Sequence, residues 1–139
     1  MYSFKEDTYK DNPILILLKD GEPVFEEAEH IKGLKFGIKK AKMIINAMAQ
    51  IEEFLKGENP PEDSKISIPP GKYDIKCYCK KYICFPRGGT TIIKPYLKIW
   101  SDDTSITRIG FGLVKAEGLI TLKDQIENFI RKNDNRRWL

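Results

Sequence analysis

Three cysteines occur in the twelve-residue stretch KCYCKKYICFPR, which covers residues 76–87. Thiolates at close spacing can ligate zinc or an iron–sulfur cluster, but such a centre needs about four soft ligands that converge on one point. The single histidine, His30, lies far away in the chain. In an extended strand Cys77 and Cys79 point to one face and Cys84 to the other. We therefore predict no metal site and no cofactor; a bulge that turned Cys84 round is the alternative left open.

The residues between the cysteines carry a different chemistry. Along residues 73–85 the odd positions are mostly apolar, whereas the even positions from 76 to 82 alternate lysine and tyrosine. The same parity recurs along residues 90–101, which predicts a second strand. Between them, Arg87-Gly88-Gly89 suits a three-residue hairpin loop because glycine readily adopts positive φ.

A loop of this length places Pro86 opposite Thr90 and thereby determines every cross-strand pair. On the even face each lysine is then opposite an aromatic ring: Tyr82 opposite Lys94, Lys80 opposite Tyr96, Tyr78 opposite Lys98, and Lys76 opposite Trp100. On the odd face the pairs form an ordinary core: Cys79 with Leu97, Cys77 with Ile99, and Ile83 with Ile93. The predicted even surface is a checkerboard of cations and rings.

Aromatic rings on a cationic sheet suit single-stranded nucleic acid. Unpaired bases stack on aromatic side chains for about 1–3 kcal/mol each, while Lys and Arg neutralise the phosphates. Duplex DNA hides its base faces and would leave the rings unused. We predict binding of single-stranded DNA or RNA, with DNA favoured and little sequence specificity, by Lys76, Tyr78, Lys80, Tyr82, Arg87, Lys94, Tyr96, Lys98 and Trp100. The alternatives are a protein-interaction module or an RNA-binding regulator that uses the same face.

No catalytic constellation is visible in the sequence. The acids Glu26, Glu27 and Glu29 cluster without a nearby base or nucleophile, and one histidine provides no obvious triad. The glycines at 33–37 and 110–112 lack the spacing of a phosphate-binding loop. We therefore predict a protein that is not an enzyme.

Charge and hydropathy agree with this prediction. The 139 residues carry a net charge of +4, but residues 1–69 hold 10 lysines, no arginine and 13 acids, whereas residues 70–139 hold 14 basic residues and 7 acids. The positive charge therefore lies in the half that contains the predicted surface. The polar start and the short apolar run at 14–18 predict a cytoplasmic protein with reduced thiols, neither exported nor membrane-bound.

An internal repeat organises the chain. The stretch FGIKKAKMIINAMAQIEEFLK, which begins at Phe36, matches FGLVKAEGLITLKDQIENFIR, which begins at Phe111, without a gap. Apolar residues at three- and four-residue spacing predict an amphipathic helix after a glycine in each copy. Upstream, PILILLKD at Pro13 resembles PYLKIWSD at Pro95, so a strand precedes each helix.

The repeat predicts an α+β protein of two unequal β-sheet-plus-helix repeats, with antiparallel sheets and amphipathic helices that pack together. We place a first repeat at residues 1–57, a proline-rich linker at 58–70, a second, nucleic-acid-binding repeat at 71–132 and a basic tail at 133–139. The tail, with Arg136, Arg137 and Trp138, either adds to the nucleic-acid contacts or is an ordinary cationic terminus.

The run YLKIWSDDTSITRIGFGLVKAEGLITLKDQIENFIRK resembles the group of single-strand-binding transcription coactivators, PUR repeats and Whirly proteins. The similarity rests on residues 97–100, 108–113 and 122–126. The resemblance implies β-β-β-β-α units that pair within a chain or between chains and bind single-stranded DNA or RNA across their sheet faces. It implies that role for Lys76, Tyr78, Lys80, Tyr82, Tyr96, Lys98 and Trp100.

The first half departs from this pattern. Its strand at 14–18 is apolar on both faces, and the face equivalent to the predicted surface carries Ile14, Ile16 and Leu18. Something should therefore cover it: the N-terminal segment around Phe4 and Tyr9, the second half, or another subunit. We expect the first repeat to be a scaffold or dimerisation copy, and the protein to be a homodimer.

Overall fold

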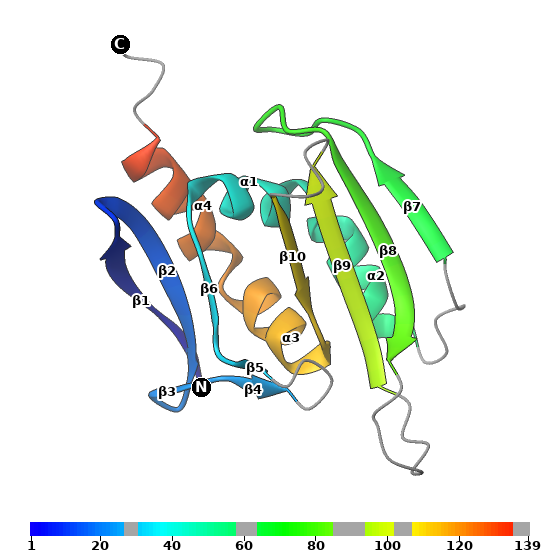
Figure 1. Cartoon of the computed structure of the whole chain (residues 1–139), viewed down its shortest axis with the longest axis horizontal. Helices are drawn as coiled ribbons and strands as arrows, with labels where there is room; N and C mark the ends of the chain where they lie inside the picture. Colours follow the sequence, from blue (N-terminus) through cyan, green and yellow to red (C-terminus); the bar gives the residue numbers. More distant parts are fainter. Residues whose placement is uncertain (27–30, 58–63, 85–93, 102–106, 135–139) are drawn as a thin grey trace.

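The computed structural model describes residues 1–26, 31–57, 64–84, 94–101 and 107–134. These residues form four helical segments, two antiparallel four-stranded sheets and a small two-stranded sheet (Figure 1). The predicted α+β class with antiparallel sheets is confirmed. No helix within the described ranges is long and apolar enough to cross a membrane.

The first sheet and its helices come from the first half of the chain. Its strands are β1 (Tyr2–Tyr9), β2 (Asn12–Lys19), β3 (Glu22–Pro23) and β6 (Leu34–Phe36). β2 pairs with all three of the others. The two-stranded sheet consists of β4 (Phe25–Glu26) and β5 (Ile31–Lys32). The helical segments that follow are α1 (Ile38–Asn46) and α2 (Met48–Lys56).

The second sheet has the order β10-β9-β8-β7. Its strands are β7 (Ser64–Ile68), β8 (Cys77–Cys84), β9 (Lys94–Ser101) and β10 (Arg108–Phe111). The chain ends in the helical segments α3 (Leu113–Thr121) and α4 (Lys123–Asn133).

Strand β7 corrects the predicted linker, because it lies inside residues 58–70. The segment SKISI alternates polar and apolar residues, and Ile68 is buried in the core. Its neighbours are rich in proline and acids, which masked the short strand signal. β7 pairs antiparallel with β8 and completes the four strands of the second sheet.

Each predicted helix begins after a glycine, as expected, but it bends once and forms two segments. Gly37 and Gly112 precede α1 and α3 with nearly identical backbone angles, φ −93° and ψ −164° against φ −93° and ψ −165°. The bends fall at Ala47 and Leu122, which occupy the same position of the repeat. The helical match in the sequence therefore extends to a shared irregularity of the backbone.

The strand register also agrees with the repeat. Leu15 of β2 lies opposite Phe36 of β6, and Leu97 of β9 lies opposite Phe111 of β10. This equivalence of Leu15 with Leu97 is the one that results from aligning PILILLKD with PYLKIWSD. The two repeats therefore share strands as well as helices.

The helices of each repeat pack against the sheet of the other repeat. The hydroxyl of Tyr2 in β1 donates to the carbonyl oxygen of Val114 in α3 at 3.1 Å. Conversely, Lys81 of β8 forms an ion pair with Glu53 of α2 at 2.6 Å. Figure 1 shows the same arrangement, with α2 behind β8 and β9 and with α4 behind β2. The repeats are interlocked and contribute to a single core.

This arrangement covers one of the two apolar faces of strand β2, the one that carries Leu15 and Leu17. Leu15 and Leu17 are buried beneath the helices of the second half, where Leu17 contacts Gly118 closely. A Cβ atom on Gly118 would lie 2.8 Å from a ring carbon of Tyr2, so only glycine allows α3 to approach this sheet. The other face of β2, with Ile14, Ile16 and Leu18, is half-buried.

Candidate nucleic-acid interface

The predicted surface lies on the face of the second sheet that points away from the helices. On the inner face Cys77, Cys79, Leu97 and Ile99 are fully buried. The residues that alternate with them along the strands, Tyr78, Lys80, Lys98 and Trp100, therefore point outward. The predicted division of β8 and β9 into a core face and an outer face is confirmed.

The predicted register is wrong by two residues. Tyr78 lies opposite Trp100, Lys80 opposite Lys98, and Tyr82 opposite Tyr96. The inner pairs shift equally: Cys77 with Ser101, Cys79 with Ile99, and Ile83 with Pro95. The described pairing ends at Cys84 and Lys94, and the predicted loop at 87–89 lies outside the described residues. A two-residue shift leaves each side chain on its predicted face but changes its partner.

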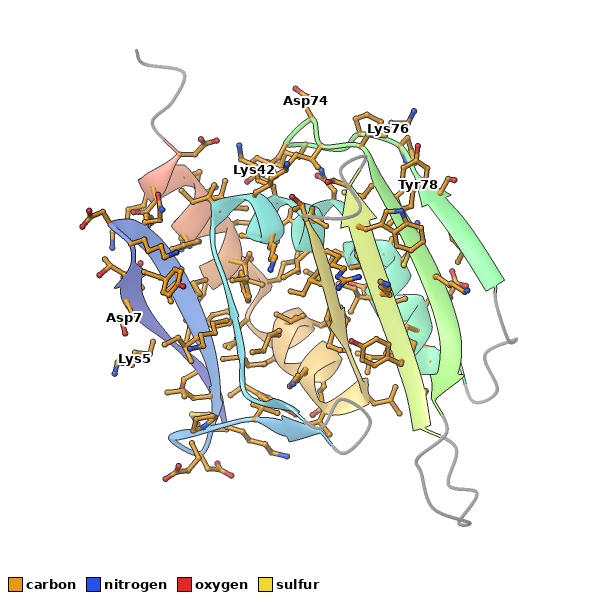
Figure 2. The ribbon with its side chains drawn as sticks, in the orientation of Figure 1. Lys5, Asp7, Lys42, Asp74, Lys76 and Tyr78 are labelled. Carbon is orange, nitrogen blue, oxygen red and sulfur yellow. The ribbon has the colours of Figure 1, made fainter. Side chains whose placement is uncertain are left out.

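In the observed register like residues are opposite one another. The rings of Tyr78 and Trp100 stack across the strands, with centroids 6.0 Å apart and planes inclined by 24°. Such stacking stabilises a cross-strand pair beyond the area it buries. The Lys76 ammonium lies 6.0 Å from the centroid of the Tyr78 ring, and Figure 2 shows both residues near the start of β8. The checkerboard is thus replaced by rows.

The lysines form the next row of the surface. Lys98 is opposite Lys80, and the Cα register places Lys65 of β7 opposite Lys80 on its other side. Like charges directly opposite each other in a sheet repel. Successive rows lie two residues apart along the strands, which corresponds to about 6.8 Å. On the outer face of β8 and β9 the ring pair Tyr78–Trp100 is therefore followed by the lysine pair Lys80–Lys98.

The other predicted site residues divide into three groups. Lys76 is exposed, whereas Tyr78, Lys80, Tyr96, Lys98 and Trp100 are half-buried. Tyr82 and Lys94 lie on β8 and β9 in the register given above. Arg87, the loop that contains it, and the tail residues Arg136, Arg137 and Trp138 are outside the described residues.

Two residues of β10 also belong to this face and were not predicted from the sequence. Arg108 is exposed and lies opposite Trp100, and Gly110 lies opposite Lys98. The parity of β9 extended to residues 108–111 would have placed both on the outer face. The pairing of β10 with β9 was the missing information.

Gly110 provides the platform for Tyr96. A Cβ atom on Gly110 would lie 2.5 Å from Cζ of Tyr96 and nearer still to its hydroxyl oxygen. The Tyr96 ring therefore lies across the backbone of β10 instead of projecting from the sheet. Glycine is required here for close approach and not for an unusual backbone angle.

The variant Gly110→Ala is expected to displace the Tyr96 ring and to lower the free energy of unfolding by about 1–2 kcal/mol through overpacking. Urea unfolding followed by circular dichroism measures the loss. In the Tyr96→Ala background the same substitution should cost little, because the side chain that clashes is absent. Equal losses in both backgrounds would contradict the contact.

The cysteines have the properties of core residues. Cys77 and Cys79 are buried thiols that form no disulfide, and burial raises the pKa of Cys79 to about 12. A neutral thiol is a poor nucleophile and a poor metal ligand. Among the residues that the structure describes, no group of three or more His, Cys, Asp or Glu side chains is placed to hold a metal ion.

At pH 8 the Cys79 thiol is expected to be alkylated at least about a hundredfold more slowly in the native protein than in the unfolded chain, since in the native protein it stays protonated and shielded. Alkylation with iodoacetamide, followed by mass spectrometry of the Cys79 peptide, measures the rate. The guanidinium-unfolded chain is the control. Similar rates in both states would show that this thiol is accessible and ionised.

Lys81 is the cation of β8 that does not belong to the outer face. Its side chain is only 6% exposed, and its ammonium binds the Glu53 carboxylate of α2. The hydrogen bond from Lys81, together with its positive charge, lowers the pKa of Glu53. The stabilisation is present above the ordinary carboxyl pKa and is lost as the pH falls through the lowered pKa in the folded state. This pair anchors β8 to the helices.

No protein-family model matches the chain, and neither a curated protein nor a solved structure matches it. What fold and surface define is a class: an α+β protein of two interlocked repeats with a cationic–aromatic sheet face. Its function must be argued from that surface.

Proposed function

We propose that the protein binds single-stranded nucleic acid, with DNA favoured, across the outer face of its second sheet and without catalysing a reaction. The observation that carries this proposal is the stacked pair of Tyr78 and Trp100 beside the lysine row of Lys80 and Lys98. Rings beside cations supply the two interactions that unpaired strands offer, stacking of bases and neutralisation of phosphates.

The row arrangement supports this proposal better than a checkerboard would. A strand that crosses β8 and β9 meets rings at Tyr78 and Trp100 and cations in the adjacent row. A phosphate that lies between Lys80 and Lys98 is attracted by two ammonium groups at once.

Fluorescence anisotropy with labelled oligo(dT), oligo(rU) and a matched DNA duplex, each over a salt series, tests the proposal. We expect single strands to bind at least about tenfold more tightly than the duplex, because base faces are accessible only in single strands. The logarithm of the affinity should fall with the logarithm of salt concentration by about 0.7 per phosphate neutralised.

Equal affinity for strands and duplex, or no binding below millimolar concentration, would exclude the proposal. An oligonucleotide affinity that does not change with salt concentration would instead favour the protein-interaction module.

The homodimer also stays a prediction, and light scattering measures the oligomeric state that tests it. The interlocked helices already join the two repeats within one chain, so a second copy is not needed to complete the core.

A further inference from the structure

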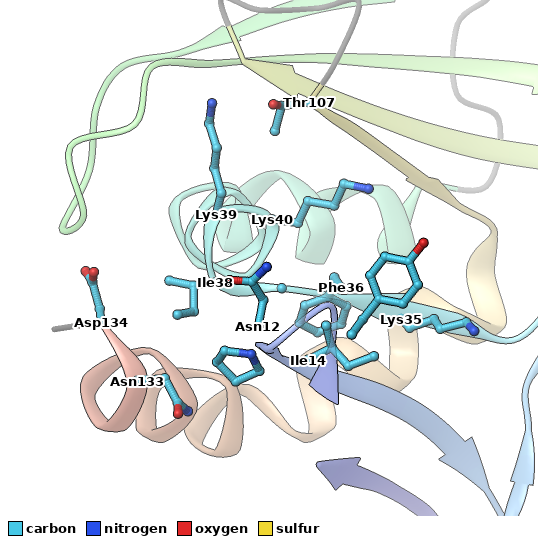
Figure 3. Close-up of a pocket in the computed structure, with 13 residues that line it drawn as sticks. Asn12, Ile14, Lys35, Phe36, Ile38, Lys39, Lys40, Thr107, Asn133 and Asp134 are labelled. Atoms are coloured by element: carbon cyan, nitrogen blue, oxygen red, sulfur yellow. The ribbon is translucent and has the colours of Figure 1, made fainter. Parts of the chain in front are cut away.

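The two four-stranded sheets meet at a cavity of about 790 Å³. Lys35 and Phe36 of β6 line it from the first sheet, and Thr107, the residue before β10, lines it from the second. Helix α1 contacts both β6 and β9 and so joins the two sheets at this place. Figure 3 shows Lys40 of α1 between Thr107 on one side and Lys35 on the other. The cavity is large enough for part of a nucleic-acid strand, since small-molecule sites measure about 300–1,000 Å³.

Arg108 connects this cavity to the candidate nucleic-acid interface. It follows Thr107 in the chain and lies opposite Trp100 on the outer face of the second sheet. Arg108 is exposed, and within the described part of the chain it forms no hydrogen bond or ion pair. A strand that leaves the rings of Tyr78 and Trp100 in the direction of β10 therefore meets a guanidinium group and then the cavity.

The positive charge of Lys35 and Lys40 is not neutralised by the protein. Lys35 is exposed, Lys40 is half-buried, and neither forms an ion pair with another described residue. Asp134 is the one carboxylate among the described residues that line the cavity, and Lys42 pairs with it at 2.6 Å. Together with Arg108, the two lysines extend the positive charge of the second sheet toward the first.

An exposed aromatic ring also lines the cavity. Tyr9, at the end of β1, is 61% exposed, whereas most large apolar side chains of the described residues are covered. The Lys10 ammonium lies 5.4 Å from the centroid of the Tyr9 ring. The same combination occurs on the second sheet, where Lys76 lies 6.0 Å from the ring of Tyr78. An accessible ring beside a cation suits an unpaired base and its phosphate.

We infer that a single strand bound on the second sheet continues past Arg108 into this cavity. There Lys35 and Lys40 bind its phosphates, and the Tyr9 ring stacks on one of its bases. The inference rests on the proposed function and extends it, because the binding site then crosses the junction of the two repeats. It gives the first repeat a part in binding, although its own sheet face carries apolar side chains in place of rings and lysines.

Fluorescence anisotropy with labelled oligo(dT) of four and of sixteen nucleotides tests the longer path, because the site sizes of single-strand-binding folds range from about 4 to 16 nucleotides. Tyr9→Ala and Lys40→Gln should each weaken binding of the long strand at least about fivefold. They should leave the affinity for the short strand unchanged within about twofold. Lys40→Gln should also lower the salt slope of the long strand by about 0.7.

Three further variants are the controls. Lys123→Gln removes an exposed lysine from α4 and should change neither affinity, whereas Trp100→Ala should weaken binding of both strands. Tyr9→Phe keeps the ring and should retain the affinity for the long strand. Circular dichroism and urea unfolding of each variant verify that its fold is intact.

An NMR titration of the full ¹⁵N-labelled chain locates each strand, and it also detects weak binding of the short one. The four-nucleotide strand should shift the amides of β8, β9 and β10. The sixteen-nucleotide strand should shift in addition those of Tyr9, Lys35 and Lys40.

Equal losses for the two strand lengths, no loss with one or both of Tyr9→Ala and Lys40→Gln, or long-strand shifts confined to β8, β9 and β10 would overturn the inference. If the long strand binds and is weakened by Trp100→Ala but not by these two variants, only this inference fails. If neither strand binds, the proposed function fails as well. The two failures are therefore distinguishable.

Discussion

Replacement of Trp100 by alanine is expected to weaken the binding of single-stranded oligo(dT) by about ten- to a hundredfold, since each base stacked on a ring contributes about 1–3 kcal/mol. The variant removes one ring and also leaves Tyr78 without its stacking partner. The loss should therefore lie in the upper part of this range. Anisotropy at one fixed salt concentration measures it.

Two controls separate lost binding from lost folding. Trp100 is half-buried on the outer face and is not part of the hydrophobic core, so the variant should unfold cooperatively. Trp100→Phe keeps a ring on Tyr78 and should retain most of the affinity. If the alanine variant binds oligo(dT) as tightly as the natural protein, this sheet face is not the interface.

Lys98→Gln provides a matched test of the cation row, because it leaves the rings in place. It should weaken binding less than Trp100→Ala does and should reduce the salt slope by about 0.7. The two variants therefore separate stacking from phosphate neutralisation.

Replacement of Asp134 by asparagine is expected to lower the free energy of unfolding by about 3 kcal/mol, because it leaves the Lys42 ammonium buried without a counter-charge. Lys42 and Asp134 join α1 to the end of α4 at 2.6 Å, and each side chain is only 8% exposed. The substitution preserves shape and removes only charge. Urea unfolding at neutral pH measures the effect.

Two controls test whether the loss comes from the buried charge: an exposed ion pair of the same kind, and a double variant that removes both charges. Glu6→Gln also removes a carboxylate from a lysine, Lys132, but both groups are largely exposed, so the cost should stay below about 1 kcal/mol. Adding Lys42→Met to Asp134→Asn should restore much of the stability, since the buried charge is gone. A loss as small as that of Glu6→Gln would contradict the role assigned to the buried pair.

On the outer surface, local sequence patterns predicted the face of each side chain but not its cross-strand partner. Side-chain parity is a property of the strand itself, so Cys77 and Cys79 could be assigned to the core from sequence. The partner of each residue depends on where the chain turns between the strands, and a turn centred on Gly88 gives a register two residues away from the observed one. Stacking of Tyr78 on Trp100 occurs only in the observed register. The residue types were predicted, but the rows were not.

The bends and the short strand show a second limit. Periodicity predicted both amphipathic helices and their glycine starts, because these depend on nearby residues. It did not reveal the bends at Ala47 and Leu122, where the apolar pattern continues without a break. The strand within residues 58–70 was hidden because it is only five residues long and its neighbours are rich in proline and acids.

The sequence by itself determined the α+β class, the repeat, the two faces of β8 and β9, and the accumulation of positive charge in the second half. Each follows from periodicity, composition or self-similarity within short segments. Only the tertiary structure decided that each helix pair covers the other repeat's sheet, that like residues form rows, and that Tyr96 lies on Gly110. These are contacts between segments far apart in the chain. They depend on shape and close packing, which no local pattern of residues encodes.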